Sequence, residues 1–192
     1  ITGTNNTLIG GLAGDAITTG SANTSVGKDS LSANTTASSN TAVGYGAMTT
    51  NTTGANNTAS GRNSLYFNTT GANNIALGMQ ALLNNTTASD NVAVGYQALY
   101  ANTTGANNTA LGAYALDANT TAASNTAVGQ TAAGANTTGT RNTVVGHEAL
   151  RFNTTGSDNT ALGVGAISAN TTGATNTAVG KSALTANTTA TS

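Results

Sequence analysis

His147 and Glu148 are the one adjacent imidazole and carboxylate pair in this chain, and such a pair could transfer protons or bind a metal ion. Neighbouring residues of an extended segment point to opposite faces, so these two side chains would not converge on one substrate. The acidic residues fall at several different spacings and form no column that could bind calcium: Asp15, Asp29, Asp90, Asp117, Glu148 and Asp158. We therefore expect no enzyme activity, no catalytic residue, no cofactor and no metal site.

The composition excludes several other kinds of site. The 24 glycines recur without the Lys and Ser/Thr that a phosphate-binding loop requires. Five basic and six acidic residues give a net charge of −1, which provides no basic stripe for nucleic acid. The chain has no cysteine, and no apolar run approaches the roughly 18 residues of a membrane span. We expect neither nucleic acid nor a membrane span, and we interpret the start within a repeat, at Ile1, as a processed or excised segment.

A 17-residue repeat must position every side chain, and it is clearest at residues 108–124, which read NTALGAYALDANTTAAS. Eleven copies without insertions begin at Asn6, Asn23, Asn40, Asn57, Asn74, Asn91, Asn108, Asn125, Asn142, Asn159 and Asn176. We call these copies coils 1 to 11 and number the repeat positions 1 to 17 from the leading Asn. A strict period predicts a solenoid in which each unit packs on its neighbours. We expect one domain over residues 1–192, with an atypical leading part (1–22) and ten regular coils (23–192).

Apolar and small residues keep fixed positions within the repeat. Position 4 is aliphatic except at Ser60, and position 9 is usually Leu, as at Leu99 and Leu116. We predict short strands on both sides of position 5, with positions 2, 4 and 9 facing inward. Positions 3 and 8 are nearly all Ala or Ser, as at Ala42 and Ala47, and we predict that they form a flat outer face for another chain. Position 5, where a turn needs a residue free to adopt positive φ, is always Gly: Gly10, Gly27, Gly44, Gly61, Gly78, Gly95, Gly112, Gly129, Gly146, Gly163 and Gly180.

Positions 12 to 14 read Asn-Thr-Thr in ten coils and predict a corner at which stacked amides form a hydrogen-bonded ladder. The ladder residues are Asn34, Asn51, Asn68, Asn85, Asn102, Asn119, Asn136, Asn153, Asn170 and Asn187. Each repeat is thus one coil of an all-β parallel β-solenoid. At about 4.8 Å per coil, eleven coils would make a rod on the order of 50 Å long.

Positions 6, 7 and 10 vary and predict a solvent-exposed face. The candidate contacts for a surface receptor on it are Tyr45, Tyr96, Tyr100 and Tyr114. Asn-Thr-Thr is also a formal glycosylation sequence, although stacked Asn side chains would be inaccessible. The candidate glycosylation sites are therefore Thr35, Thr36, Thr52, Thr53, Thr103 and Thr104. Regular Thr columns also suggest ice binding as an alternative function. It is less favoured, because no clean Thr-x-Thr strand column is present.

The stretches NTAVGYGAM (40–48) and NVAVGYQAL (91–99) resemble the head repeats of trimeric autotransporter adhesins. They resemble still more the NTAxGxxAL…NTTG arrays of phage tail fibres and bacterial surface proteins. This resemblance covers essentially the whole chain. It implies a left-handed parallel β-roll, often trimeric, in an extracellular fibrous or adhesive protein.

The sequence therefore predicts a non-enzymatic structural subunit of a fibre or filament, located outside the cell, on its surface or in a virion fibre. The alternative is an adhesin or phage tail-fibre shaft that binds a cell-surface receptor or glycan. The expected partner is a second copy of the chain, as a homo-oligomer, a trimer or a filament. We predict end-to-end assembly through the apolar first coil, whose candidate residues are Ile1, Leu8, Ile9, Leu12 and Ile17.

Overall fold

Every repeat forms one short strand at repeat positions 2 to 4, where Thr, Val, Ile and Leu favour extended backbone. The computed structural model describes residues 2–191. It contains, over these residues, eleven strands and no helix. The strands are β1 (Thr7–Ile9), β2 (Thr24–Val26), β3 (Thr41–Val43), β4 (Thr58–Ser60), β5 (Ile75–Leu77), β6 (Val92–Val94), β7 (Thr109–Leu111), β8 (Thr126–Val128), β9 (Thr143–Val145), β10 (Thr160–Leu162) and β11 (Thr177–Val179).

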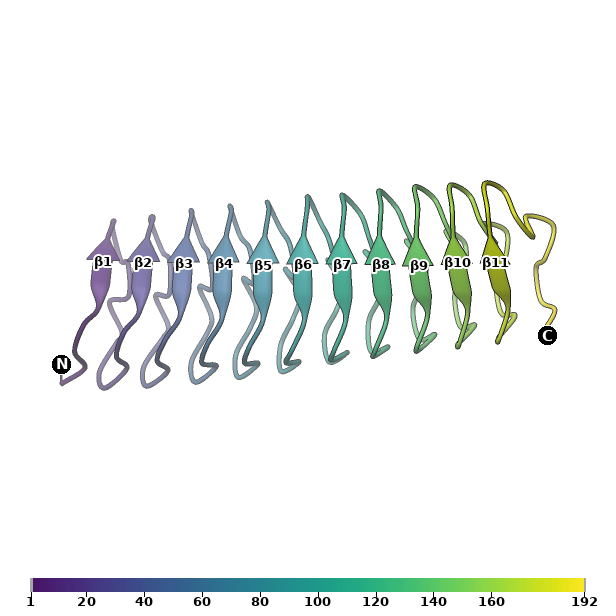
Figure 1. Cartoon of the computed structure of the whole chain (residues 1–192). Helices are drawn as coiled ribbons and strands as arrows, with labels where there is room; N and C mark the ends of the chain where they lie inside the picture. Colours follow the sequence, from purple (N-terminus) through teal and green to yellow (C-terminus); the bar gives the residue numbers. More distant parts are fainter. Residues whose placement is uncertain (1, 192) are drawn as a thin grey trace.

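The strands form one parallel sheet in chain order from β1 to β11. The register follows the repeat, so that Thr41 of β3 pairs with Thr58 of β4 and Thr58 pairs with Ile75 of β5. In Figure 1 the strands rise in front and the return segments pass behind them as the chain advances from β1 to β11, which is a left-handed winding. The predicted fold, an all-β parallel solenoid with 17-residue coils, is confirmed.

The return segment of each coil is not the second strand that the sequence predicted. Positions 6 to 11 form turns, because positions 7 and 9 adopt left-handed backbone, as Gln97 (φ 53°) and Leu99 (φ 52°) do. A side chain in this conformation costs about 1 kcal/mol. Coil stacking offsets that cost, since the Leu99 N–H donates to Ala115 O of the next coil at 3.0 Å. Hydrogen bonding between coils therefore continues around the return segment without a regular strand.

The core lies inside the coils and consists of repeat positions 3, 8 and 9. Ala93, Ala98 and Leu99 are fully buried, whereas Val43 at position 4 is 38% exposed. The prediction for position 9 was right. The inward prediction for positions 2 and 4 was wrong, and so was the outer Ala face, because each thin coil buries mostly small side chains beside its Leu, Val144 being the largest of them at position 3. Strand alternation then turns the larger residues at positions 2 and 4 outward.

Coil 1 and coil 11, at the two ends of the rod, expose their apolar side chains more than the coils between them do. Leu8, Ile9 and Leu12 are 39%, 59% and 58% exposed, while Ile17 is buried at 1%. At the other end, Val179 and Leu184 are 69% and 49% exposed. Ile1, the remaining candidate for end-to-end contact, lies outside the described residues. Ile17 instead packs within the rod.

Candidate functional site

Two columns of Asn amides hold the corner of the rod. At position 12, Asn68 Nδ2 donates to Asn51 Oδ1 of the preceding coil at 2.8 Å and to Gly71 O of its own coil at 2.9 Å. At position 1, the Asn40 N–H donates to Asn23 Oδ1 at 3.0 Å. All position-12 amides from Asn34 to Asn170 are fully buried, so they are inaccessible for sugar attachment in the folded rod.

Asn187 is an exception to the predicted ladder. Its Oδ1 accepts the Ala190 N–H at 3.0 Å, and Asn170 Oδ1 has no partner within the described residues. Asn187 belongs to the last coil, which is exposed, so its amide folds onto its own turn instead of bridging to the preceding coil. The hydrogen bonds between side-chain amides at position 12 therefore extend from Asn34 to Asn170.

The position-5 glycines lie where the backbones of neighbouring coils approach closely. Gly95 has φ 136°, and a Cβ atom on it would lie 2.6 Å from the carbonyl carbon and oxygen of Gly112 in the next coil. Residues with a side chain rarely adopt this backbone conformation, and no side chain would fit between the two coils here. These glycines therefore set the coil spacing and need no ligand to explain them.

The threonines at positions 13 and 14 differ in accessibility. Thr52 Oγ1 donates to Thr69 O at 3.0 Å and is half-buried, whereas Thr53 is exposed. The same division holds for the other candidate glycosylation residues. The exposed ones are Thr36, Thr53 and Thr104, and the half-buried ones are Thr35, Thr52 and Thr103. Modification of any of them stays a prediction.

The outer face of the sheet carries two columns of side chains along the whole rod. Position 2 is mostly Thr, interrupted by Ile75 and Val92, and position 4 is aliphatic except for Ser60. Several position-4 side chains are well exposed, among them Leu77 at 36%, Leu111 at 46% and Val145 at 40%. We call the outward side chains of positions 2 and 4 the strand face.

His147 and Glu148 do not form a joint site. Glu148 Oε1 accepts a hydrogen bond from Arg151 Nη1 at 2.7 Å, and His147 is exposed beside them. Within residues 2–191 there is no group of three His, Cys, Asp or Glu residues that could hold a metal ion. Glu148 therefore forms an ion pair with Arg151 and not with His147.

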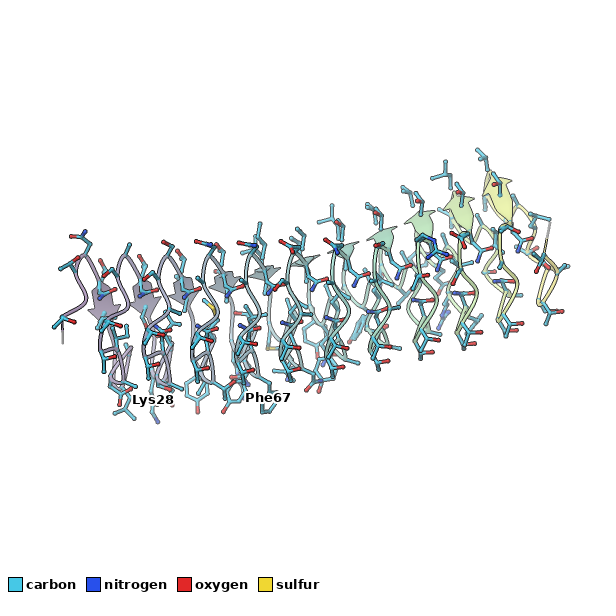
Figure 2. All side chains as sticks on the ribbon, turned by 90° about the horizontal axis from the view of Figure 1, so that it is seen from below. Lys28 and Phe67 are labelled. Carbon is cyan, nitrogen blue, oxygen red and sulfur yellow. The ribbon has the colours of Figure 1, made fainter. Side chains whose placement is uncertain are left out.

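The edge of the rod opposite the strand face carries the charged and aromatic side chains of positions 6, 7, 10 and 11. Figure 2 shows Lys28 and Phe67 projecting from this edge, away from the strands. The predicted tyrosine contacts do not gather in one patch. Tyr96 and Tyr114 pack edge to face at 5.1 Å between ring centres, while Tyr45 lies three coils away from Tyr96. Tyr45 is 49% exposed, and Tyr100 is half-buried.

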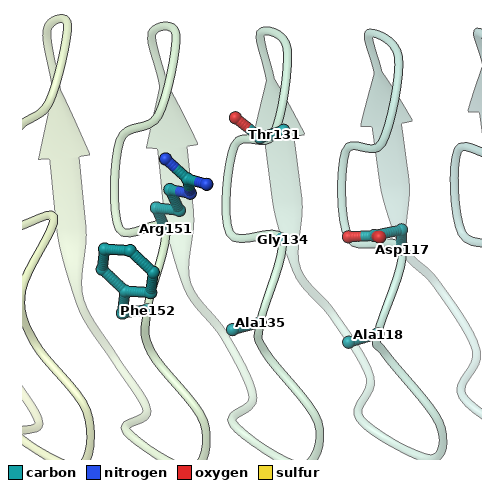
Figure 3. A pocket seen from close by; sticks show the side chains of 7 residues that line it. All are labelled: Asp117, Ala118, Thr131, Gly134, Ala135, Arg151 and Phe152. Atoms are coloured by element: carbon teal, nitrogen blue, oxygen red, sulfur yellow. The ribbon is translucent and has the colours of Figure 1, made fainter.

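A hollow on this edge lies over Gly134, with a volume of about 330 Å³. Asp117, Gly134 and Arg151 occupy position 10 in three successive coils, so the glycine removes one side chain from a continuous column. Figure 3 shows the Asp117 carboxylate pointing over the neighbouring coil and the Phe152 ring on the other side. The residues lining this Gly134 hollow are Asp117, Ala118, Thr131, Gly134, Ala135, Arg151 and Phe152.

Opposite charges flank the Gly134 hollow. Burial raises the pKa of Asp117, and hydrogen bonds from the N–H groups of Asp117 and Ala118 partly oppose this shift. The Arg151 guanidinium lies 4.9 Å from the centre of the Phe152 ring. Phe152 is 50% exposed, so its ring is accessible to a ligand.

A second hollow is built in the same way over Gly46, with a volume of about 400 Å³. Asp29, Gly46 and Asn63 occupy position 7 of successive coils. A Cβ atom on Gly46 would lie 2.6 Å from Asn63 Oδ1, and this oxygen has no partner within the described residues. The residues lining this Gly46 hollow are Asp29, Ser32, Tyr45, Gly46, Thr49, Arg62, Asn63 and Tyr66. Sequence reasoning missed both hollows, although the signal was visible as a glycine interrupting a column of larger residues.

No family model, curated protein or solved structure matches the chain. Residues 2–191 contain no helix that could cross a bilayer. The regular 17-residue coils, the buried Asn ladders and the unbroken parallel sheet define the class of the protein, a tandem-repeat β-solenoid.

Proposed function

We propose that this protein is a non-enzymatic structural subunit of an extracellular fibre, in which copies of the rod associate side by side through the strand face. The observation that carries the proposal is the aliphatic column at position 4, which runs from Ile9 to Val179 with Ser60 as the one polar member. The resemblance to fibrous surface proteins supports the extracellular location.

Burial of the strand face would contribute to association. Apolar surface removed from water contributes about 25 cal/mol per Å², and monomeric proteins rarely expose long contiguous apolar patches. Every coil presents the same pair of positions at the same spacing, so parallel copies can match along the whole rod. Three copies around a common axis is the arrangement that the resemblance implies. End-to-end contact through Leu8, Ile9 and Leu12 stays a separate prediction.

The oligomeric state tests this proposal. We expect the chain to sediment as an oligomer, and we expect Val94→Lys combined with Leu111→Lys to yield a folded monomer. These residues lie side by side on β6 and β7, so the variant places two charges in the middle of the strand face. Thr121→Lys is the matched control, because Thr121 is exposed at the Asn-Thr-Thr corner. A monomeric wild-type chain, or a double variant that still associates, would contradict lateral association.

Receptor or glycan binding is the second candidate function, and the hollows over Gly46 and Gly134 favour it. Both hollows lie on the edge opposite the strand face, so a rod associated through its strands would still present them. A shaft and a binding surface are therefore compatible in one molecule.

The outward Thr column keeps ice binding as a further alternative. Position 2 places Thr109, Thr126, Thr143 and Thr160 in register on successive strands of the sheet. A thermal hysteresis measurement separates this function from fibre assembly. Ice binding predicts a monomer with freezing-point depression, whereas the proposed subunit is an oligomer without it.

A further inference from the structure

The two glycine hollows share one construction. In each, a glycine interrupts a side-chain column, an Asp stands in the preceding coil, and an Arg and an aromatic ring stand in the following coil. The Asp, Arg and aromatic residues are Asp117, Arg151 and Phe152 at Gly134, and Asp29, Arg62 and Tyr66 at Gly46. We propose that both hollows bind a neutral pyranose unit of a surface glycan. This inference rests on the second candidate function and not on fibre assembly.

The lining of the Gly134 hollow suits a sugar ring. An exposed aromatic ring packs against the apolar C–H face of a pyranose, and Phe152 offers such a ring. The Asp117 carboxylate accepts hydrogen bonds from hydroxyl groups, and the Arg151 guanidinium donates to sugar oxygens. The bare backbone of Gly134 between them leaves the space that the ring would occupy.

The Gly46 hollow offers a similar set of groups with more polar partners. Tyr66 and Tyr45 supply two aromatic rings, and Asp29 supplies a carboxylate. Asn63 Oδ1 adds an acceptor that lacks a donor within the described residues. A small shift of the Asn63 side chain would let a ligand hydroxyl donate to this oxygen.

The charges favour a neutral ligand over an ion. At Gly134, the Asp117 carboxylate stands on one side and the Arg151 guanidinium, whose Nη1 donates to Glu148 at 2.7 Å, stands on the other. At Gly46, Asp29 Oδ2 lies 3.9 Å from Lys28 Nζ. Arg62 lines the other side of the same hollow. Each hollow presents both an acidic and a basic side chain, so an anion or a cation would meet repulsion from one side. A polyol can use both donors and acceptors.

The size and spacing of the hollows indicate how they would act. Volumes of about 330 and 400 Å³ lie at the lower end for small-molecule sites and suit one sugar unit each. The hollows lie five coils apart, which corresponds to about 24 Å along the rod. Two weak sites on one rigid rod bind a glycan-coated surface more tightly than either site alone.

Saturation-transfer NMR on the full chain tests the proposal, with the methyl glycosides of mannose, galactose and glucose as probes. Gly134→Thr and Gly46→Asn fill the hollows with residues that the repeat already carries at the same positions, Thr49 and Asn63. We expect saturation transfer to ring C–H protons of at least one glycoside with the wild-type chain. The double variant should weaken this binding about tenfold or more.

Phe152→Ala and Tyr66→Ala should each remove part of the signal, since each deletes one aromatic ring. Tyr100→Ala is the matched control, because Tyr100 is an aromatic residue on the same edge but lines neither hollow. Circular dichroism checks that each variant keeps the fold. The proposal is wrong if none of the three neutral glycosides binds, or if the double variant binds as well as the wild-type chain.

A glycan array separates this inference from the second candidate function on which it rests. If the double variant binds the same glycans as the wild-type chain, receptor binding stands and the hollows are not its sites. If the wild-type chain binds neither the array nor cells, both ideas fail. Loss of array binding in the double variant, with Tyr100→Ala unchanged, supports both.

Discussion

Asn102 Nδ2 donates to Asn85 Oδ1 across 3.0 Å, joining two coils, and also donates to Gly105 O of its own coil at 2.9 Å. Its own Oδ1 accepts from Asn119 Nδ2 at 2.9 Å. Asn102 is fully buried, so its amide depends on the preceding coil for an acceptor and on the next coil for a donor. Such networks stabilise strongly when complete and are costly when one member is missing.

Replacing Asn102 by Ala should therefore destabilise the rod by about 1 to 3 kcal/mol for each buried group left without a partner. The measurement is the shift in the urea or thermal unfolding midpoint. Asn107→Ser is the matched control, because Asn107 is exposed and Ser39 and Ser124 adopt the same backbone conformation at that repeat position. Equal effects of the two changes would show that the ladder contributes little.

A second prediction concerns the close approach of the coils at position 5. Gly95→Ala should destabilise by about 3 kcal/mol or more, because it combines strained backbone with a clash against Gly112. Gly11→Ala should be nearly neutral, since a Cβ atom on Gly11 meets nothing within 4 Å. Unfolding midpoints of the two variants check this, and a tolerated Gly95→Ala would contradict the role assigned to these glycines.

The period and the types of residue at fixed positions were enough to predict the parallel solenoid, because a strict repeat leaves stacking as the one way to bury each apolar position. The burial of Leu99 and Leu116 followed from the same reasoning. The same reasoning did not predict which side chains of the strand face inward. Thr-Ala-Val can bury either its centre or its two flanks, and the choice depends on how much space the opposite segment leaves.

The space inside the coil depends on the backbone conformation of the return segment, which no single residue type predicts. Leu99 reaches the core from left-handed backbone, which Leu rarely adopts, and so the return segment curls where a strand was predicted. The two hollows escaped prediction for a related reason. Gly46 and Gly134 interrupt columns of larger residues in the aligned repeats, but the hollows over them, next to Asp29 and Asp117, form only when the coils stack.

The inward position of the strand centre leads to a third prediction. Ala93→Leu should destabilise by about 1 to 3 kcal/mol, because Ala93 is fully buried and the largest side chain that any coil buries at this position is the smaller Val144. Val94→Leu should change stability by less than about 0.5 kcal/mol, because position 4 faces outward and already carries Leu at Leu77 and Leu111. Thermal unfolding at matched concentration checks both. The reverse order of effects would mean that the strand faces are assigned wrongly.

The last prediction uses two carboxylates whose pKa values shift in opposite directions. Burial raises the pKa of Asp117 above its ordinary value of 3.8, whereas the Arg141 guanidinium, which hydrogen-bonds the carboxylate, lowers the pKa of Asp158. For Asp117 the folded state binds the proton more tightly, so stability falls as pH rises from the unfolded pKa to the folded one. For Asp158 the opposite holds, and its contribution is present above the unfolded pKa and is lost as pH falls through the folded one.

Asp117→Asn should therefore raise the unfolding midpoint at neutral pH, and the difference should vanish below the ordinary pKa of 3.8. Asp158→Asn should lower the midpoint at neutral pH, because it removes the negative charge and one of the two oxygens that accept hydrogen bonds of 2.7 and 2.8 Å from Arg141. That loss should be small, since the pair is exposed, and it should disappear in acid and shrink with added salt. Thermal unfolding of the wild-type chain and both variants across this pH range measures the two effects. A common sign for both variants at neutral pH would contradict the assignment of burial to Asp117 and of ion pairing to Asp158.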